Sequence, residues 1–172
     1  MVRIWWYISI LALIQLWSCS PRLSQRDANW NQRTGVFRWA GGEVTLPGGF
    51  RYREDHGADS FEGHFTSPDG KIIVRHDIGG YAGASANRRE AVAFEERVID
   101  GSRAWIAQRK WPDGPVATTF MFAVTFPDNG CANFFLTSNN VADAWPIQRI
   151  AQSFRPKGKS DGGRFCVLDR KQ

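Results

Sequence analysis

The stretch Thr118–Ser138, TTFMFAVTFPDNGCANFFLTS, decides the fold of this chain. We interpret it as two strands joined by a tight turn over Pro127–Gly130, because Pro, Asp, Asn and Gly are the residues that most readily reverse a chain. If Phe126 lies opposite Cys131, one face carries Phe120, Phe122, Val124 and Phe126 and the other carries Met121, Ala123, Phe134 and Leu136. A strand pair that is apolar on both faces must be covered on both. We therefore expect it at the centre of a sheet, with further layers packed against it.

Two further hairpins precede this central pair. The first is Asp59–Ile78, in which Ser60–Thr66 alternates apolar and polar residues. It turns at Ser67–Gly70, where SPDG has proline and glycine in the positions that a type I turn favours. Glu95–Trp111 turns at the Asp-Gly pair Asp100–Gly101. Short strands separated by glycine and proline occupy Thr34–Arg53. Successive hairpins of this kind predict an antiparallel sheet.

Helical spacing is clearest in Val141–Phe154. Its apolar side chains fall on one stripe, and Pro146 lies in the first turn, where a helix tolerates proline; the stripe comprises Trp145, Ile147, Ile150, Ala151 and Phe154. Ser85–Phe94 has a weaker helical pattern, with Ser85 as a candidate cap. Hairpins with helices packed on them predict an α+β sandwich.

The first 19 residues have the composition of an export signal. Arg3 supplies the positive start, and Ile4–Leu16 is an apolar run too short to span a membrane comfortably. The run ends in Leu-Trp-Ser-Cys, which resembles a bacterial lipobox with Cys19 as the lipidated residue. Trp17 departs from the small or aliphatic residue usual at that position, and an ordinary cleaved signal peptide is the alternative. Both interpretations place the mature chain outside the cytoplasm; the first predicts a periplasmic, membrane-anchored lipoprotein.

Four segments follow from this interpretation. Residues 1–19 are the signal peptide, 20–33 a polar tether, 34–155 a single α+β domain and 156–172 a C-terminal tail. About 150 residues remain after export, enough for one domain with its own core.

The three cysteines predict one disulfide bond. With Cys19 taken by the lipid, Cys131 and Cys166 remain, and two cysteines in an oxidising compartment most simply pair with each other. No Cys-x-x-Cys or Cys/His spacing supports a metal or a catalytic thiol. The bond would hold the tail against the turn of the central hairpin.

The charge balance argues against nucleic acid as a partner. The net charge is +5 over 172 residues, and the basic residues are scattered along the chain. A nucleic-acid-binding domain concentrates its basic residues on one face.

Polar residues able to do chemistry gather in Glu54–Asp77. This segment contains all three histidines together with several acidic residues: His56, His64, His76, Glu54, Asp55, Asp59, Glu62 and Asp77. Histidine and carboxylate together suit a zinc-like cation, but no compact ligand motif such as HExxH is present. In the expected hairpin Glu62 lies opposite Arg75 or His76, so a solvated cross-strand ion pair explains the same residues without a metal. No G-x-S-x-G motif or dinucleotide fingerprint occurs.

Three short motifs mark the order of elements: the opening Leu46-Pro47-Gly48-Gly49-Phe50, the TTFMF strand and the closing Ile150-Ala151-Gln152-Ser153-Phe154. In this order they resemble the PsbP-like superfamily, and the resemblance covers roughly residues 37 to 154. Members of that superfamily share an α/β/α sandwich, and most act in binding or assembly. The resemblance implies no reaction and no cofactor.

Two classes of function follow from these patterns. The favoured one is a non-catalytic, envelope-anchored module that binds or assembles a protein or another envelope component. The rival is a metal-dependent enzyme that uses the histidine and carboxylate region 54–77.

Overall fold

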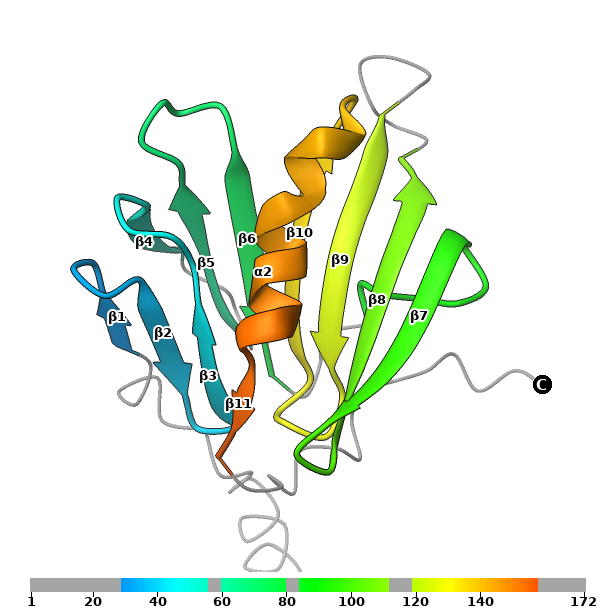
Figure 1. Ribbon diagram of the computed structural model, residues 1–172, viewed down its shortest axis with the longest axis horizontal. Helices are drawn as coiled ribbons and strands as arrows, with labels where there is room; N and C mark the ends of the chain where they lie inside the picture. The colour runs from blue at the N-terminus through cyan, green and yellow to red at the C-terminus, as the bar shows by residue number, and fades with distance from the viewer. Residues whose placement is uncertain (1–28, 56–59, 80–83, 112–118, 158–172) are drawn as a thin grey trace, which may run out of the picture.

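Seven antiparallel strands form the main sheet, in the order β4-β5-β6-β10-β9-β8-β7 (Figure 1). The computed structural model describes residues 29–55, 60–79, 84–111 and 119–157. The strands are β4 (Arg51–Asp55), β5 (Phe61–Thr66), β6 (Ile73–Ile78), β7 (Ala91–Ile99), β8 (Ser102–Lys110), β9 (Phe120–Phe126) and β10 (Ala132–Ser138). The hairpin β9–β10 lies inside the sheet with neighbours on both sides, which confirms its predicted central place.

A second, smaller sheet packs on the main one in the order β1-β2-β3-β11. Its strands are β1 (Asn29–Asn31), β2 (Val36–Trp39), β3 (Gly42–Thr45) and β11 (Arg155–Pro156). The predicted tether included β1, so the folded domain begins earlier than expected. The side-chain oxygen of Asn31 accepts hydrogen bonds from the backbone of Arg33 and Thr34, 3.1 Å each, and this turn folds β1 back onto β2.

The predicted fold class, an α+β or α/β/α sandwich with helices packed on the sheet, is wrong. Within the described residues the chain forms two β-sheets, and its helical part is one short 3₁₀ turn, η2 (Val141–Ala144), followed by the nine-residue α2 (Trp145–Ser153). The sequence pattern overstated the helices because Pro146 forces α2 to start late, and because Ala91–Phe94 belongs to a strand. None of the helices in the described ranges has the length and hydropathy of a membrane span.

The main core lies between the two sheets and α2. The helix contacts β3, β9 and β10, and its predicted stripe is buried except for Trp145, which is 39% exposed. Fully buried aromatic rings fill the space between the layers: Phe37, Phe50, Phe65, Phe126, Phe134 and Phe154. Burying each ring contributes roughly 1.5–3 kcal/mol, so this cluster is a principal source of stability.

The register of β9–β10 differs from the predicted one by one residue. Ala132, rather than Cys131, lies opposite Phe126. Gly130 and Cys131 both have left-handed backbone angles, with φ of 81° and 49°, so the turn extends one residue further than PDNG indicates. A shift of one residue moves a strand's side chains to the other face. Phe134 and Leu136 accordingly lie in the main core with Phe122, not on the face of Ala123.

On the opposite face of the main sheet a strap, residues 84–87, lies over β9 and β10, in place of the helix predicted over Ser85–Phe94. The backbone N–H of Ser85 donates to Oδ1 of Asn133 (2.9 Å), and the N–H of Ala86 donates to Oγ1 of Thr125 (3.1 Å). Ala86 of the strap packs with Trp105, Ala107 and Ala123 in a second apolar cluster. Both faces of the central pair are therefore covered, as the sequence indicated.

Candidate functional site

The structure separates the histidines that the sequence grouped together. In the β5–β6 hairpin His64 pairs with Arg75, and Gly63 pairs with His76. Successive residues of a strand point to opposite faces, so His76 points into the core and His64 points away from it. Glu62 lies opposite Asp77, so the predicted pairing with Arg75 or His76 is wrong.

His76 is a neutral core residue. Its ring lies among the rings of Phe37, Phe61 and Tyr52, at centroid distances of 4.9, 5.0 and 5.7 Å. Burial lowers its pKa to about 3, and its Nε2 is 3.2 Å from the Tyr52 hydroxyl. Burial also raises the pKa of Tyr52. This pair satisfies polar atoms inside the core.

His64 forms a pair with Asp55 on the other face of the sheet. Nδ1 of His64 is 2.8 Å from Oδ2 of Asp55, and this hydrogen bond lowers the pKa of the Asp55 carboxyl. The described ranges contain no group of three His, Cys, Asp or Glu side chains arranged to hold a metal ion. His56 and Asp59 lie outside the described residues.

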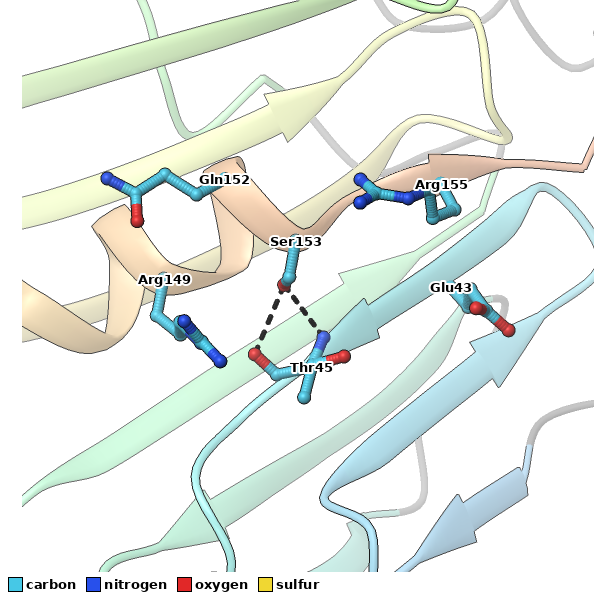
Figure 2. A pocket seen from close by; sticks show the side chains of 6 residues that line it. All are labelled: Glu43, Thr45, Arg149, Gln152, Ser153 and Arg155. Carbon is cyan, nitrogen blue, oxygen red and sulfur yellow. Dashed lines mark hydrogen bonds between the residues drawn. The ribbon is translucent and has the colours of Figure 1, made fainter.

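A polar basin of about 390 Å³ lies where α2, β3 and β11 meet (Figure 2). It is lined by Glu43, Thr45, Arg149, Gln152, Ser153 and Arg155. These residues come from segments about a hundred positions apart and form no motif, which is why sequence reasoning missed them. The helical period could have shown only that Arg149 and Gln152 share the polar side of α2.

The floor of the basin is held in place by Ser153. Its Oγ accepts a hydrogen bond from the Thr45 N–H (2.8 Å) and lies 3.2 Å from the Thr45 carbonyl oxygen, to which it donates; Figure 2 shows both contacts. They fasten the end of α2 to β3. Because the hydroxyl is engaged as both donor and acceptor, Ser153 has a structural role here.

The charges in the basin are unequally compensated. The Glu43 carboxylate is bound by Arg38, with Nε and Oε2 2.8 Å apart. Arg155 donates from Nη1 to the Phe154 carbonyl oxygen at 2.9 Å, where the helix end has a partial negative charge. Within the described part of the chain, Arg149 has no hydrogen-bond or ion-pair partner. The basin therefore has a positive charge with unused donors.

A smaller apolar groove of about 230 Å³ lies on the other side of α2, against β7 and β8. Side chains of Ile106, Phe122 and Ile147 line it, and Glu95 and Gln148 add polar groups. It offers a contact surface but no cluster of catalytic groups.

The predicted modification sites are only partly within the described structure. Cys131 is fully buried at the end of the central turn, and its sulfur is engaged in a disulfide bond. Cys19 and Cys166 lie outside the described residues, so lipidation of Cys19 and the pairing of Cys131 with Cys166 stay predictions.

Comparisons with known proteins give no assignment: no protein-family model, curated protein or solved structure matches this chain. The residues behind the PsbP-like resemblance have a packing role, because Leu46, Phe50, Ile150 and Phe154 are all buried in the main core. Membership of that superfamily stays a prediction.

Proposed function

We propose that this chain is a non-catalytic binding module of the bacterial cell envelope, anchored through Cys19, and that its basin binds a phosphate group. The observation that carries the proposal is Arg149, an uncompensated guanidinium in a basin whose floor is fixed by the Ser153–Thr45 contacts. Guanidinium groups bind phosphate through paired, charge-assisted hydrogen bonds.

Neighbouring groups support the same ligand class. The side-chain amide of Gln152 and the remaining N–H groups of Arg155 line the basin together with Arg149. Glu43 opposes an anion less than its charge indicates, because Arg38 already binds its carboxylate. A net positive, donor-rich basin favours an oxyanion over a cation or an apolar ligand.

The residues that line the basin also favour a binding role over a catalytic one. Ser153 is held by Thr45, and none of the histidines and cysteines that the structure describes lines the basin. Among the described residues nothing supports the metal-dependent enzyme considered from the sequence, because His64 and His76 point to opposite faces of the sheet.

The phosphate could belong to a soluble molecule or to a phospholipid headgroup, and two assays distinguish these sources. The chain is produced without residues 1–19, so that no lipid anchor affects vesicle binding, and its folding is checked by circular dichroism. One assay titrates inorganic phosphate by calorimetry. The other measures co-sedimentation with phosphatidylglycerol vesicles and with phosphatidylcholine vesicles.

We expect saturable binding in at least one assay, weakened at least fivefold by Arg149→Ala. Arg51→Ala is the matched control, because Arg51 is also an exposed arginine without a partner in the described structure, but on β4. Binding to phosphate alone indicates a soluble ligand, and binding to phosphatidylglycerol alone indicates a membrane surface. No binding in either assay, or equal losses in the two variants, would overturn the proposal.

A further inference from the structure

Strand β7 is a long, open edge of the main sheet. It has nine residues and, within the described ranges, pairs only with β8 (Figure 1). Val92 and Val98 on this strand are 56% and 71% exposed. The outer edge of such a strand presents unpaired backbone N–H and C=O groups, which can pair with another strand.

The centre of β7 has a charge pattern that complements itself. Glu95 and Arg97 form an ion pair within the strand, and Glu96 lies between them. When two copies of β7 pair antiparallel in one continuous sheet, a two-fold axis perpendicular to the sheet relates them. That axis keeps each side chain on its own face of the sheet. The axis must then place one residue opposite its own copy.

Charge selects one of the possible registers. Centring on Glu95 or on Arg97 places a like-charged pair at the axis and forms no Glu–Arg pair. Centring on Glu96 places Glu95 opposite Arg97 of the second copy, and this pair forms twice. Opposite charges across an antiparallel pair are stabilising, so this register has two favourable pairs against one repulsive Glu96–Glu96 pair.

Glu96 has a cationic neighbour within its own copy. Arg103 on β8 is near enough to Glu96 to interact with it electrostatically. Arg103 is also bound to Asp128, with Nη2 and Oδ1 2.7 Å apart, which holds its side chain in place. Because Asp128 already compensates much of the Arg103 charge, the Glu96–Glu96 pair remains the one unfavourable contact of this register.

The same register covers apolar surface. It places Phe94 opposite Val98 of the second copy and Ala93 opposite Ile99. Val98 is the most exposed large apolar side chain of the described structure, and Phe94 already packs against the second apolar cluster. The irregular pairing between Ala91 and Ala93 leaves Ala93–Ile99 as the regular part of the strand.

We propose that this chain self-associates through β7, edge to edge and antiparallel about Glu96, so that the main sheets of two copies become one. A single strand edge is a small interface, and we expect a dissociation constant on the order of micromolar. The inference does not depend on phosphate binding, because the basin residues belong to α2, β3 and β11.

The test measures association by sedimentation velocity from about 1 to 200 µM of the chain produced without residues 1–19, so that no lipid anchor contributes to association. Glu95→Arg and Arg97→Glu each place like charges opposite each other twice, so each variant alone should associate at least tenfold more weakly than the wild type. An equimolar mixture of the two variants should associate, because the charges at the paired positions are then opposite. Neither variant keeps the ion pair within its own strand, so recovery in the mixture reports pairing between copies.

Glu54→Arg on β4, the other edge of the sheet, is the matched charge-reversal control and should leave association unchanged. Circular dichroism of each variant establishes that it is folded. A wild type that stays monomeric across this range, or a mixture that associates no better than its components, would overturn the inference. An effect of Glu54→Arg equal to that of Glu95→Arg would also overturn it.

Discussion

Nε2 of His76 lies 3.2 Å from the hydroxyl oxygen of Tyr52, and both side chains lie over the bare backbone of Gly63. A Cβ on Gly63 would be 2.6 Å from Nε2 of His76 and 2.9 Å from the Tyr52 hydroxyl. The hydrogen bond in the core therefore depends on the absence of a side chain on the neighbouring strand.

We expect Gly63→Ala to destabilise the protein by roughly 1–3 kcal/mol, the usual effect of overpacking a core. Gly48→Ala is the control, because no atom lies within 4 Å of a Cβ built there. Urea denaturation of the two variants measures the difference in free energy of unfolding. Equal effects would contradict the steric role of Gly63.

Acid should destabilise the fold through His76. Its pKa is about 3 in the folded state and 6.5 in the unfolded chain, so the unfolded state binds the proton more tightly. The stability that neutral His76 contributes is complete above pH 6.5 and is lost as the pH falls from 6.5 towards 3, by roughly 3–5 kcal/mol in all. Denaturant melts between pH 7 and 4 should show this slope.

His76→Phe should flatten the slope, whatever its effect on stability at pH 7. Val74→Ala removes buried apolar atoms from the same strand but retains the histidine, and should keep the slope. The assignment fails if the two variants have the same pH dependence.

Truncating Phe154 should be far more damaging than changing the polar face of β5. Phe154 is fully buried, and its ring stacks on Phe126 at a centroid distance of 3.9 Å. Phe154→Ala should lower the free energy of unfolding by about 3–5 kcal/mol. His64→Ala, which removes only the partly exposed pair with Asp55, should have an effect of about 1 kcal/mol or less. Thermal and denaturant melts giving the reverse ranking would overturn the assignment of Phe154 to the core.

We expect the disulfide partner of Cys131 to be Cys166. Denaturing the unreduced protein should leave both residues unlabelled by a thiol reagent, and a non-reducing digest should yield the two joined peptides. The bond would close a loop of about 35 residues, so Cys166→Ser should lower stability by roughly 3–4 kcal/mol. Joined peptides containing Cys19 and Cys131 would show that the pairing is wrong.

Lipidation of Cys19 should hold the protein in the membrane fraction. Cys19→Ala should either release soluble protein or block processing, because the lipidated residue is also the expected cleavage point. Fractionation and the mass of the mature protein measure both. An unchanged fractionation and mass would contradict the lipoprotein prediction and favour an ordinary signal peptide.

The sequence predicted the parts of the fold that local patterns determine. The turns at Ser67–Gly70 and Asp100–Gly101 form as expected, the latter with both residues at positive φ. The central place of β9–β10 followed from its apolar faces. The register of β9–β10 could not be predicted in the same way. Cys131 adopts a left-handed conformation, and cysteine is not a residue type that favours one.

The candidate site could not be predicted, since it depends on how distant segments pack. That Arg149 has no partner among the described residues is seen only when α2 lies on β3. The arginine–glutamate pattern of β7 suggests pairing only once β7 is known to be an edge strand. His76 shows the opposite error. Because His76 lies close in sequence to other histidines and carboxylates, it suggested a metal ligand. The alternation of side chains along β6 instead buries His76 among aromatic rings.

The strap over residues 84–87 has a consequence for the order of folding. Its two acceptors, Thr125 and Asn133, face each other across β9–β10, with Oγ1 and Oδ1 2.7 Å apart. A hairpin mispaired by one residue would turn one of these side chains to the opposite face, and the amides of Ser85 and Ala86 would lose their shared docking point. The strap can therefore make both hydrogen bonds only on correctly paired strands, and we infer that it docks late in folding.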